Sequence, residues 1–291
     1  MATFFLNQET QAIIQGITGK VGQAQARWML AAGTKLVGGV TPGKGGQVVE
    51  GLPVYDTVSE AVCDQKANAS VVFVPAQAAR EAAISALEAG IKLLVIVTEH
   101  IPIRDTMEIK FRAQLIGANV LGPNCPGIFV PGFGKLGIMP QGIFKKGCIG
   151  VVGRSGTLTY EVIANLSENG LGETAAIGIG GDPVVCTEFT QILEQFEKDE
   201  ETKGVALIGE IGGGAEERAV QQIAKMKKPV VALIAGRSAP PGKRFGHAGA
   251  IVQAGVGSAK QKIDLLRQAG VIIANSPAQI PALLKGRLNE N

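Results

Sequence analysis

Residues 12–22 read AIIQGITGKVG, and this stretch decides the fold. The short apolar run at 12–15 is typical of a buried strand, and glycines at 16, 19 and 22 separate it from an alanine-rich amphipathic segment. Glycines between a first strand and a first helix let the backbone approach a phosphate, which the helix N-terminus binds through its N–H groups. The GxxGxxG spacing therefore predicts a phosphate-binding turn, with a plain tight turn as the alternative.

Short Val- and Ile-rich runs alternate with longer amphipathic segments along the rest of the chain. Strands are expected at 12–15, 35–40, 70–74, 93–97, 119–121, 149–152, 205–208, 230–234 and 271–274. Helices are expected at 21–32, at 76–89, from 102, at 157–169, at 215–226 and up to 269. This alternation predicts parallel βαβ units, with helices on both faces of each sheet.

The alternation is interrupted between residues 122 and 147. Glycine and proline are too dense there for a regular element, which predicts a linker or a long functional loop. The alternation resumes afterwards, and no repeat relates the two halves. We therefore expect an α/β protein of two doubly wound parallel-sheet domains, residues 1–125 and 126–291.

Composition and charge exclude several classes of protein. The 291 residues carry 28 Lys and Arg against 25 Asp and Glu, a net charge of +3 that predicts no nucleic-acid surface. The four cysteines form no CxxC and no cluster with histidine, which predicts no zinc site and a reducing compartment. No apolar run approaches the ~18–20 residues of a membrane span, and the first residues lack a basic secretory n-region. We expect a cytoplasmic protein.

The end of the second expected strand favours a phosphorylated ligand. An NAD site places an acidic residue there to bind the ribose hydroxyls. Residues 40–46 instead read VTPGKGG, with Lys44 at the tip. A cation there suits the phosphorylated ribose of NADP or coenzyme A, and the alternative is an exposed lysine on a flexible loop.

A second candidate phosphate site is the segment 153–160, GRSGTLTY, which follows a strand and opens a helix. Ser155 or Thr157 is placed to cap that helix, and an ordinary capped helix is the alternative. The nucleoside triphosphate motif GxxxxGK[ST] does not occur in the sequence.

His247 is the candidate nucleophile or base. It lies in GKRFGHAGA, between glycines and beside Lys243 and Arg244, whereas a core histidine would lie in an apolar strand or helix. An imidazole near its ordinary pKa of about 6.5 is largely neutral at pH 7 and can attack. Glu210, in GEIGGG at the end of another strand, is a candidate to bind one ring nitrogen and leave the other to react.

Two further residues are weaker candidates. His100 lies in TEHIP at a strand-to-helix junction and is expected to be structural or solvent-facing. Cys125 lies in GPNCPG without a base that the local sequence reveals, which favours a small loop or pocket residue over a nucleophile.

Ten segments together resemble one family, the α subunits of succinyl-CoA synthetase (succinate–CoA ligase). In chain order they are GITGKVG, GGVTPGKGG, GLPVYDTV, VFVPA, TEHIP, GPNCPGI, RSGTLTYE, GIGGDP, GEIGGGAEE and GKRFGHAGAI. The resemblance covers nearly the whole chain. It implies a Rossmann-like CoA-binding domain followed by a flavodoxin-like ligase domain, in an enzyme of the tricarboxylic acid cycle. It also implies a separate β subunit with an ATP-grasp domain that binds Mg2+ and ATP or GTP, in an αβ or α2β2 assembly.

The resemblance also assigns roles by matching position. It implies that His247 is phosphorylated by the nucleotide, that Glu210 is its hydrogen-bond partner, and that the phosphoryl group passes to a dicarboxylic acid before CoA forms the thioester. Residues at the family's CoA-binding positions are Thr18, Gly19, Lys20, Val21, Lys44, Val97, Thr98 and Glu99. Ser155, Gly156 and Thr157 match the helix N-terminus that receives the phosphohistidine. Tyr160 matches a residue associated with the acid substrate.

Departures from the family pattern leave the acid substrate open. His100 replaces the glycine of the usual TEGIP, and Gly153 replaces a usual serine. The usual GTFH reads GQAQ at 22–25, the usual THLG reads VVEG at 48–51, and VVC at 184–186 replaces small polar residues. None of these positions is His247 or Glu210. Relatives of this fold act on malate and citrate, so these acids remain alternatives to succinate.

Two other functions compete with the ligase. An NADP-dependent oxidoreductase would explain the glycine-rich turn and Lys44 but would leave the motifs of the second half unused. A CoA-binding regulatory module without catalysis would retain the first domain's site and make His247 dispensable.

Overall fold

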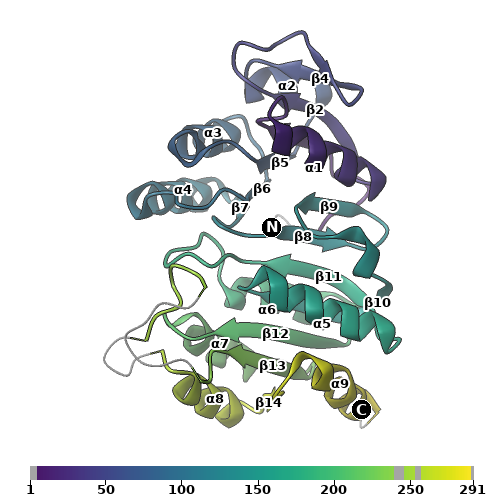
Figure 1. Cartoon of the computed structure of the whole chain (residues 1–291), viewed down its shortest axis with the longest axis vertical. Coiled ribbons are helices and arrows are strands. Elements are labelled where there is room, and N and C mark those ends of the chain that lie inside the picture. Colours follow the sequence, from purple (N-terminus) through teal and green to yellow (C-terminus); the bar gives the residue numbers. More distant parts are fainter. Residues whose placement is uncertain (1–4, 239–245, 253–256, 290–291) are drawn as a thin grey trace. The chain divides into compact units, whose positions relative to one another are not determined.

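The computed structural model describes residues 5–238, 246–252 and 257–289, and the chain divides into two compact units. The first comprises Met1–Gln141 with Val184–Cys186, and the second comprises Gly142–Pro183 with Thr187–Asn291. Each unit is built on a mainly parallel sheet with flanking helices (Figure 1). The predicted pair of doubly wound α/β units is confirmed.

The sheet of the first unit has seven strands in the order β3-β4-β2-β1-β5-β6-β7. The strands are β1 (Ala12–Gln15), β2 (Leu36–Val40), β3 (Val48–Val49), β4 (Leu52–Tyr55), β5 (Ala69–Val72), β6 (Leu93–Ile96) and β7 (Asn119–Leu121). All neighbours are parallel except β3, which runs antiparallel to β4. The central strands are short and fully buried, as expected where helices cover both faces of a sheet.

Four helices flank this sheet: α1 (Lys20–Ala31), α2 (Val58–Gln65), α3 (Ala76–Glu88) and α4 (Ile103–Ile116). Parallel crossovers are right-handed, so the reversal of direction after β4 places α1 on one face and the other three on the opposite face. There α2 packs on α3, and α3 and α4 lie side by side (Figure 1). Small alanines on α3, such as Ala79 and Ala83, let that helix approach the sheet closely within one aliphatic core.

The region predicted as a linker or loop contains a hairpin, which corrects that prediction. Strands β8 (Gly127–Val130) and β9 (Gly134–Gly137) pair antiparallel. The Thr34 hydroxyl donates to the carbonyl of Lys135 at 2.7 Å and accepts from its N–H at 2.8 Å. The glycines permit close pairing, because a Cβ on Gly127 would lie 1.9 Å from the carbonyl oxygen of Leu136. The compact unit that contains the hairpin runs from Met1 to Gln141, whereas the sequence predicts a first domain of residues 1–125.

A short segment from far along the sequence also belongs to the first unit. The N–H of Cys186 donates to the carbonyl of Gly122 at 2.8 Å, and Lys110 Nζ donates to the carbonyl of Val185 at 3.1 Å. Residues 184–186 are thus tied to the first unit by backbone hydrogen bonds.

The second unit contains five parallel strands in the order β14-β13-β12-β10-β11. They are β10 (Lys146–Gly153), β11 (Glu173–Gly178), β12 (Gly204–Glu210), β13 (Val230–Ala235) and β14 (Ile272–Ile273). Its helices are α5 (Gly156–Glu168), α6 (Phe189–Lys198), α7 (Ala215–Ile223), α8 (Ala259–Gln268) and α9 (Ile280–Asn289). Helices α6, α7 and α8 pack in sequence, and α5 packs with α9.

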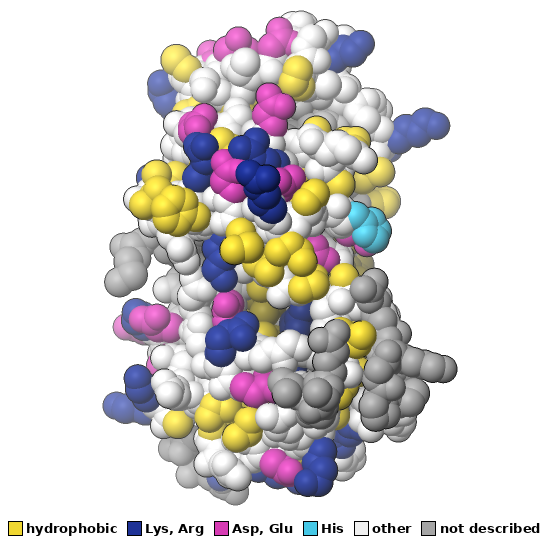
Figure 2. All heavy atoms as spheres, turned by 90° about the vertical axis from the view of Figure 1, so that its left-hand side faces the viewer, with side chains coloured by type: hydrophobic (Ala, Val, Ile, Leu, Met, Phe, Trp, Pro, Cys, Tyr) yellow, Lys and Arg dark blue, Asp and Glu magenta, His cyan; other side chains and the backbone are white. Residues whose placement is uncertain are grey.

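The solvent face of α4 carries an apolar stripe. Ile103, Met107, Phe111 and Leu115 are spaced by four residues, and each is more than half exposed. Figure 2 shows hydrophobic side chains gathered on the side of the first unit that carries α3 and α4, next to a cluster of charged side chains. No helix among the described residues is both long and apolar enough to cross a membrane.

Candidate active site

Each sheet has one point where the order of its strands reverses direction along the chain. In the first unit this point lies between β1 and β5, and in the second it lies between β10 and β12. At such a point the loops leaving adjacent strands diverge, and ligands bind outside the carboxyl ends of the strands. The candidate site residues predicted from the sequence follow these strands or their neighbours.

The turn after β1 requires glycine at two positions. Gly16 has a φ of +85°, and a Cβ on Gly22 would lie 2.2 Å from the carbonyl oxygen of Gly16. Gly19 is the N-cap of α1 and has no side chain to occupy the N–H groups of the first turn, which begins with Lys20 and Val21. Those N–H groups and the lysine together fit a phosphate.

The loop that carries Lys44 is held by side chains at both ends. The N–H of Lys44 donates to the carbonyl of Thr41 at 3.1 Å, and the Thr41 hydroxyl lies 3.2 Å from that of Thr18. The N–H of Gly45 donates to Oδ1 of Asp56 at 2.8 Å. No sequence pattern singles out Asp56, since it lies beyond the next strand. The structure brings Lys44 and Thr18 to loops that leave neighbouring strands.

Val97, Thr98 and Glu99 follow β6. The Thr98 hydroxyl donates to the carbonyl of Val74, after β5, at 2.7 Å, which fixes this segment beside the strand-order reversal. His100 has a φ of +63°, the left-handed region that favours glycine, and its exposed ring lies 3.5 Å from the Glu99 carboxylate. That backbone conformation explains why glycine is well suited to this position.

In the second unit the predicted pair of His247 and Glu210 is in contact. Glu210 ends β12 with its side chain buried, and its Oε2 lies 2.8 Å from Nδ1 of His247. The imidazole ring rests on Gly181, in the loop after β11. Because the carboxylate binds Nδ1, Nε2 is the ring nitrogen left for chemistry.

The carboxylate changes the protonation of the histidine. The hydrogen bond that Nδ1 of His247 donates to Glu210 raises the pKa of His247 above its ordinary value, while burial of the ring acts in the opposite direction. The sequence alone predicts an imidazole near its ordinary pKa. The difference arises because a neighbouring anion stabilises the imidazolium form.

Arg154, inside the motif 153–160, was missed by the sequence analysis. Its buried guanidinium Nε lies 3.4 Å from Oε1 of Glu210 and 3.3 Å from the carbonyl of Gly180. Its Nη2 donates to the carbonyl of Asp182 at 3.0 Å. Arg154 thus contacts both the partner carboxylate of His247 and the loop on which the imidazole ring rests. An arginine at the start of a helix motif gives no sequence signal for such a contact.

A pocket of about 310 Å³ joins the histidine to the N-terminus of α5. It is lined by Ser155, Thr157, Leu158, Glu210, Ile211, Ala235, Gly236, Gly246, His247 and Ala250. The hydroxyl of Ser155 caps α5 by accepting from the N–H of Leu158 at 3.4 Å, and Gly156 begins the helix. Tyr160 lies one turn further along α5 and is not one of the lining residues. The positive end of the α5 dipole therefore faces the same space as His247.

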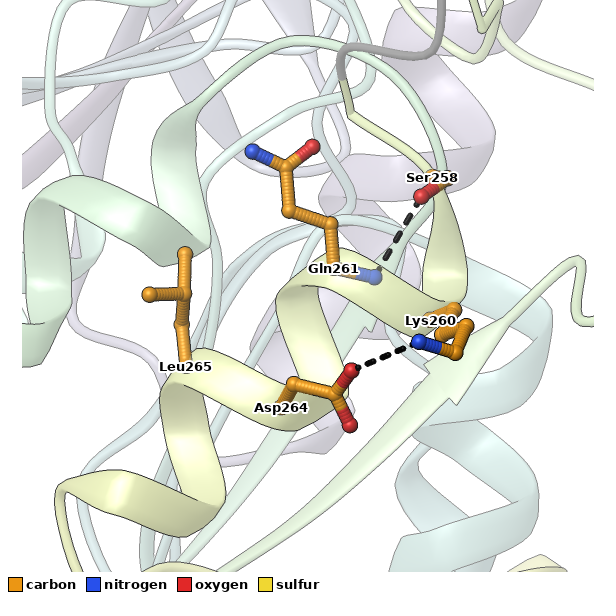
Figure 3. Close-up of a pocket in the computed structure, with 5 residues that line it drawn as sticks. All are labelled: Ser258, Lys260, Gln261, Asp264 and Leu265. Atoms are coloured by element: carbon orange, nitrogen blue, oxygen red, sulfur yellow. Dashed lines mark hydrogen bonds and ion pairs between the residues drawn. The ribbon is translucent and has the colours of Figure 1, made fainter.

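A second, more open pocket of about 370 Å³ lies on α8 (Figure 3). Ser258 caps the helix by accepting from the N–H of Gln261 at 3.3 Å, and Lys260 pairs with Asp264 at 3.3 Å. Leu265 completes its lining. These are ordinary helix-stabilising contacts, and this pocket is distinct from the one that contains His247.

The described residues include two buried cysteines and no cluster of candidate metal ligands. Cys125 is buried, and its Sγ donates to the carbonyl of Ile96 at 3.4 Å. Burial raises the pKa of the Cys186 thiol to about 12. Within 5–238, 246–252 and 257–289, no group of three or more His, Cys, Asp or Glu side chains could hold a metal ion. Lys243 and Arg244, expected beside His247, lie outside the described residues.

Comparison with known protein families agrees with both units. Residues 7–100 match the CoA binding domain family, and residues 152–272 match the CoA-ligase family. The fold and the site therefore define a CoA-binding ligase chain.

Curated relatives define the family more closely. The chain is 51% identical over 279 residues to a succinate–CoA ligase [ADP-forming] subunit alpha 2 of Archaeoglobus fulgidus, covering 96% of this chain and 97% of the relative. It is 51% identical over 283 residues to the corresponding alpha subunit of Methanothermobacter thermautotrophicus, covering 97% and 96%. The chain belongs to the family of succinate–CoA ligase α subunits.

Solved structures share the fold at lower identity. ATP citrate lyase from Methanothrix soehngenii, in complex with citrate and coenzyme A, superposes with a TM-score of 0.87 at 24% identity, over 97% of this chain and 51% of that one. A dinucleotide-forming acetyl-coenzyme A synthetase 1 from Ca. Korarchaeum cryptofilum gives a TM-score of 0.74 at 22% identity, over 93% and 59%. Both similarities concern the fold alone.

Proposed function

We propose that this chain is the α subunit of a succinate–CoA ligase that works through a phosphohistidine at His247. The overall reaction converts succinate, CoA and a nucleoside triphosphate to succinyl-CoA, nucleoside diphosphate and phosphate. The observation that carries the proposal is the 2.8 Å contact between His247 Nδ1 and Glu210, in a pocket shared with Ser155 and Thr157 at a helix N-terminus.

His247 and Glu210 supply the nucleophile and its electrostatic support. Nε2 attacks the γ-phosphorus of the nucleotide, the bond to the bridging oxygen breaks, and the diphosphate leaves. The ring then carries a positive charge, which the Glu210 carboxylate at Nδ1 stabilises. Attack requires the neutral imidazole, so the raised pKa of His247 lowers the reactive fraction while favouring the charged intermediate.

The N-terminus of α5 supports the phosphorylated state. A phosphoryl group carries close to two negative charges, and the N–H groups and dipole of a helix N-terminus stabilise such an anion. We assign this role to Ser155, Gly156 and Thr157. Glycines near the histidine, such as Gly246 with a φ of +74°, suit a loop that serves two half-reactions.

The remaining steps transfer the acyl group. A carboxylate oxygen of succinate attacks phosphorus, and the electron pair of the N–P bond returns to Nε2, which gives succinyl phosphate. The CoA sulfur then attacks the acyl carbon, the bond from that carbon to the phosphate oxygen breaks, and phosphate leaves with the thiol proton. We assign Tyr160 to the acid substrate. Succinate is preferred to malate and citrate because the relatives at 51% identity are succinate–CoA ligases.

CoA is assigned to the first unit. The glycine turn, with a helix N-terminus that no side chain caps, fits a phosphate of CoA, and Lys44 fits the phosphorylated ribose. The proposed contacts are the side chains and backbone of Thr18, Gly19, Lys20, Val21, Lys44, Val97, Thr98 and Glu99. The match of residues 7–100 to the CoA binding domain family supports this assignment over an NADP site.

The chain is proposed to act with a β subunit that carries an ATP-grasp domain, Mg2+ and the nucleotide, in an αβ or α2β2 complex. The relatives are named as alpha subunits of ADP-forming enzymes, which favours ATP over GTP. Large exposed apolar side chains, such as Phe111 and Leu115 on α4, are typical of protein contact surfaces. The cysteines of the described residues form no disulfide, which fits the cytoplasm, where we place the protein.

The test uses the complex co-purified with its β subunit. Incubation with γ-32P-ATP and Mg2+, followed by an alkaline quench, should place acid-labile label on this chain. His247→Asn should abolish labelling and succinyl-CoA formation while CoA still binds, and His100→Asn is the matched control that should retain both. Label on His247→Asn, or none on the wild-type chain in an active complex, would overturn the proposal. CoA binding by both chains, with neither label nor succinyl-CoA formation in the wild-type complex, would favour a CoA-binding regulatory module. Binding of NADPH without CoA would favour an oxidoreductase.

A further inference from the structure

Lys262 is a fully buried lysine on α8 that forms hydrogen bonds with the backbone at the end of β12. Its Nζ donates to the carbonyl oxygens of Glu210, at 2.9 Å, and of Gly212, at 2.6 Å. It also forms an ion pair with the buried carboxylate of Glu216, in the first turn of α7. A buried charge is retained only where it is paired and hydrogen-bonded, and Lys262 meets both conditions.

Glu216 binds the backbone N–H of Glu210, the second backbone group of that residue. Its Oε1 accepts from the backbone N–H of Glu210 at 3.0 Å. The ion pair of Lys262 and Glu216 therefore binds both the N–H and the carbonyl of the residue whose side chain contacts His247.

The sheet leaves these two backbone groups without a strand partner. The N–H of Arg154, directly after β10, donates to the carbonyl of Ile208 at 3.1 Å. Beyond that bond the chain turns into α5, while β12 continues to Glu210. On its other edge β12 stays paired with β13, where Glu210 lies opposite Ala235. The ion pair thus takes the place of the neighbouring strand at Glu210, the residue whose carboxylate contacts His247.

The position of α8 is fixed by separate contacts. The N–H of Gly212 donates to the carbonyl of Gly257 at 2.8 Å, immediately before the helix. Ser258 caps the helix, and the Lys260–Asp264 ion pair lies on its exposed side (Figure 3). Lys262 extends from a helix that is anchored at its first residue.

We propose that Lys262 and Glu216 are positioning residues for the His247–Glu210 pair, a role in phosphoryl transfer that rests on the proposed function. The ion pair holds the Glu210 peptide so that the carboxylate stays within hydrogen-bond distance of Nδ1. A displacement of about 1 Å at a reacting group lowers a rate by as much as a hundredfold, so the backbone of Glu210 must be fixed.

The test compares Lys262→Met, Glu216→Gln and the double variant Lys262→Met/Glu216→Leu. Glu217→Gln is the matched control, because Glu217 lies 3.7 Å from Lys262 but does not contact the Glu210 backbone. Three quantities are measured: the melting temperature, the pKa of His247 by NMR in the full chain, and the rate of His247 phosphorylation by ATP in the complex with the β subunit.

Lys262→Met should lower the melting temperature, since it leaves Glu216 buried and unpaired. It should also bring the pKa of His247 down towards about 6.5 and slow phosphorylation by about tenfold to a hundredfold. The double variant removes both charges, so it should regain part of the loss in melting temperature. It should not restore the pKa of His247 or the rate of phosphorylation. Glu216→Gln keeps an oxygen that can accept from the N–H of Glu210. Its pKa of His247 and its phosphorylation rate should therefore lie between those of the wild type and of Lys262→Met. Glu217→Gln should match the wild type in pKa and rate.

Recovery of the wild-type pKa and rate in the double variant would overturn the proposal and leave a purely structural role. If Lys262→Met does not fold, the double variant and Glu216→Gln still decide the matter. The NMR measurement needs no phosphorylation. Loss of the raised pKa in a chain that is never phosphorylated would therefore support the positioning role and count against the proposed function.

Discussion

Gly181 leaves the space that the His247 ring occupies. A Cβ on Gly181 would lie 2.3 Å from Cγ and 2.6 Å from Nδ1 of His247, the nitrogen that contacts Glu210. The same glycine accepts a hydrogen bond from the N–H of Gly249 at 3.2 Å. Because residue 181 is a glycine, the imidazole ring has room to reach the carboxylate of Glu210.

Gly181→Ala should displace the ring of His247. We expect the pKa of His247 to fall towards its ordinary value and phosphorylation of the complex to slow by at least about tenfold, because the hydrogen bond to Glu210 is lost. NMR titration and labelling with γ-32P-ATP measure the two effects. Gly286→Ala is the control, since a Cβ there meets nothing within 4 Å. Wild-type phosphorylation in Gly181→Ala would show that the ring does not need this contact.

Glu210→Gln tests the origin of the raised pKa of His247. The amide can still accept from Nδ1–H but carries no charge, so the pKa should fall and the rise of phosphorylation with pH should move to lower pH. The maximum rate should also fall, because the ring's positive charge loses its counter-ion. The measurement is the phosphorylation rate from pH 5.5 to 8.5. An unchanged pH profile would show that another group controls the titration.

The same pair contributes to stability in a pH-dependent way. Because folding raises the pKa of His247, the contribution is complete below about pH 6.5 and is lost as the pH rises through the raised pKa. The melting temperature of wild type minus that of Glu210→Gln should therefore shrink as the pH rises. A constant difference across this range would contradict the assignment.

Lys44→Ala should weaken CoA binding. Loss of a charge-assisted contact to phosphate costs about 1.5–3 kcal/mol, or about a tenfold to hundredfold increase in Kd by calorimetry. Dephospho-CoA, which lacks the 3′-phosphate, should bind the variant and the wild type equally. Lys92→Ala is the control, because Lys92 is exposed at the amino end of β6, away from the loops that carry the site. Equal losses for both ligands would place Lys44 on the pyrophosphate instead.

His100→Gly should stabilise the first unit, because glycine adopts a φ of +63° without the steric cost that an L side chain pays. The gain is limited to about 1 kcal/mol, since glycine also loses more entropy on folding. Urea denaturation at pH 7 compares the free energy of unfolding of His100→Gly with that of the wild type. A loss of stability would show that the imidazole itself makes a favourable contact.

Glu173→Gln should flatten part of the pH dependence of stability. Burial raises the pKa of Glu173 from 4.5 to about 7, although Ser167 donates to the carboxylate at 3.2 Å. The native state then holds a proton that the unfolded chain releases, so stability should fall as the pH rises from about 4.5 to 7. Thermal melts across this range compare wild type with the variant. Glu168→Gln, at an exposed site on α5, should keep the wild-type slope.

The strands that the sequence predicted contain short apolar runs rich in Val, Ile and Leu. β11 was missed because ETAAIG contains two alanines, follows Gly172 and itself ends in Gly178. β4 was missed because LPVY contains a proline, which a strand near the edge of a sheet tolerates. The β8–β9 hairpin depends on its contact with Thr34, about a hundred residues away, and no local pattern reports such a contact.

The candidate site was predictable where chemistry and local pattern coincide. His247 and Glu210 stand out as a histidine among glycines and a carboxylate at a strand end, and the structure brings them together. Other residues act through contacts with backbone groups that lie far away in the sequence, and a single sequence does not reveal such contacts. These residues are Arg154, Asp56 and Lys262. The pKa of His247 depends on that geometry as well.

The tie between residues 184–186 and the first unit has a practical consequence for anyone dissecting this protein. A fragment that ends at Gln141 would lack the peptide that bonds to Gly122, and the complementary fragment would keep three residues that are foreign to it. No single cut in the chain yields two intact units. One proteolytic cleavage, or a gene split at one point, would therefore disrupt both of them.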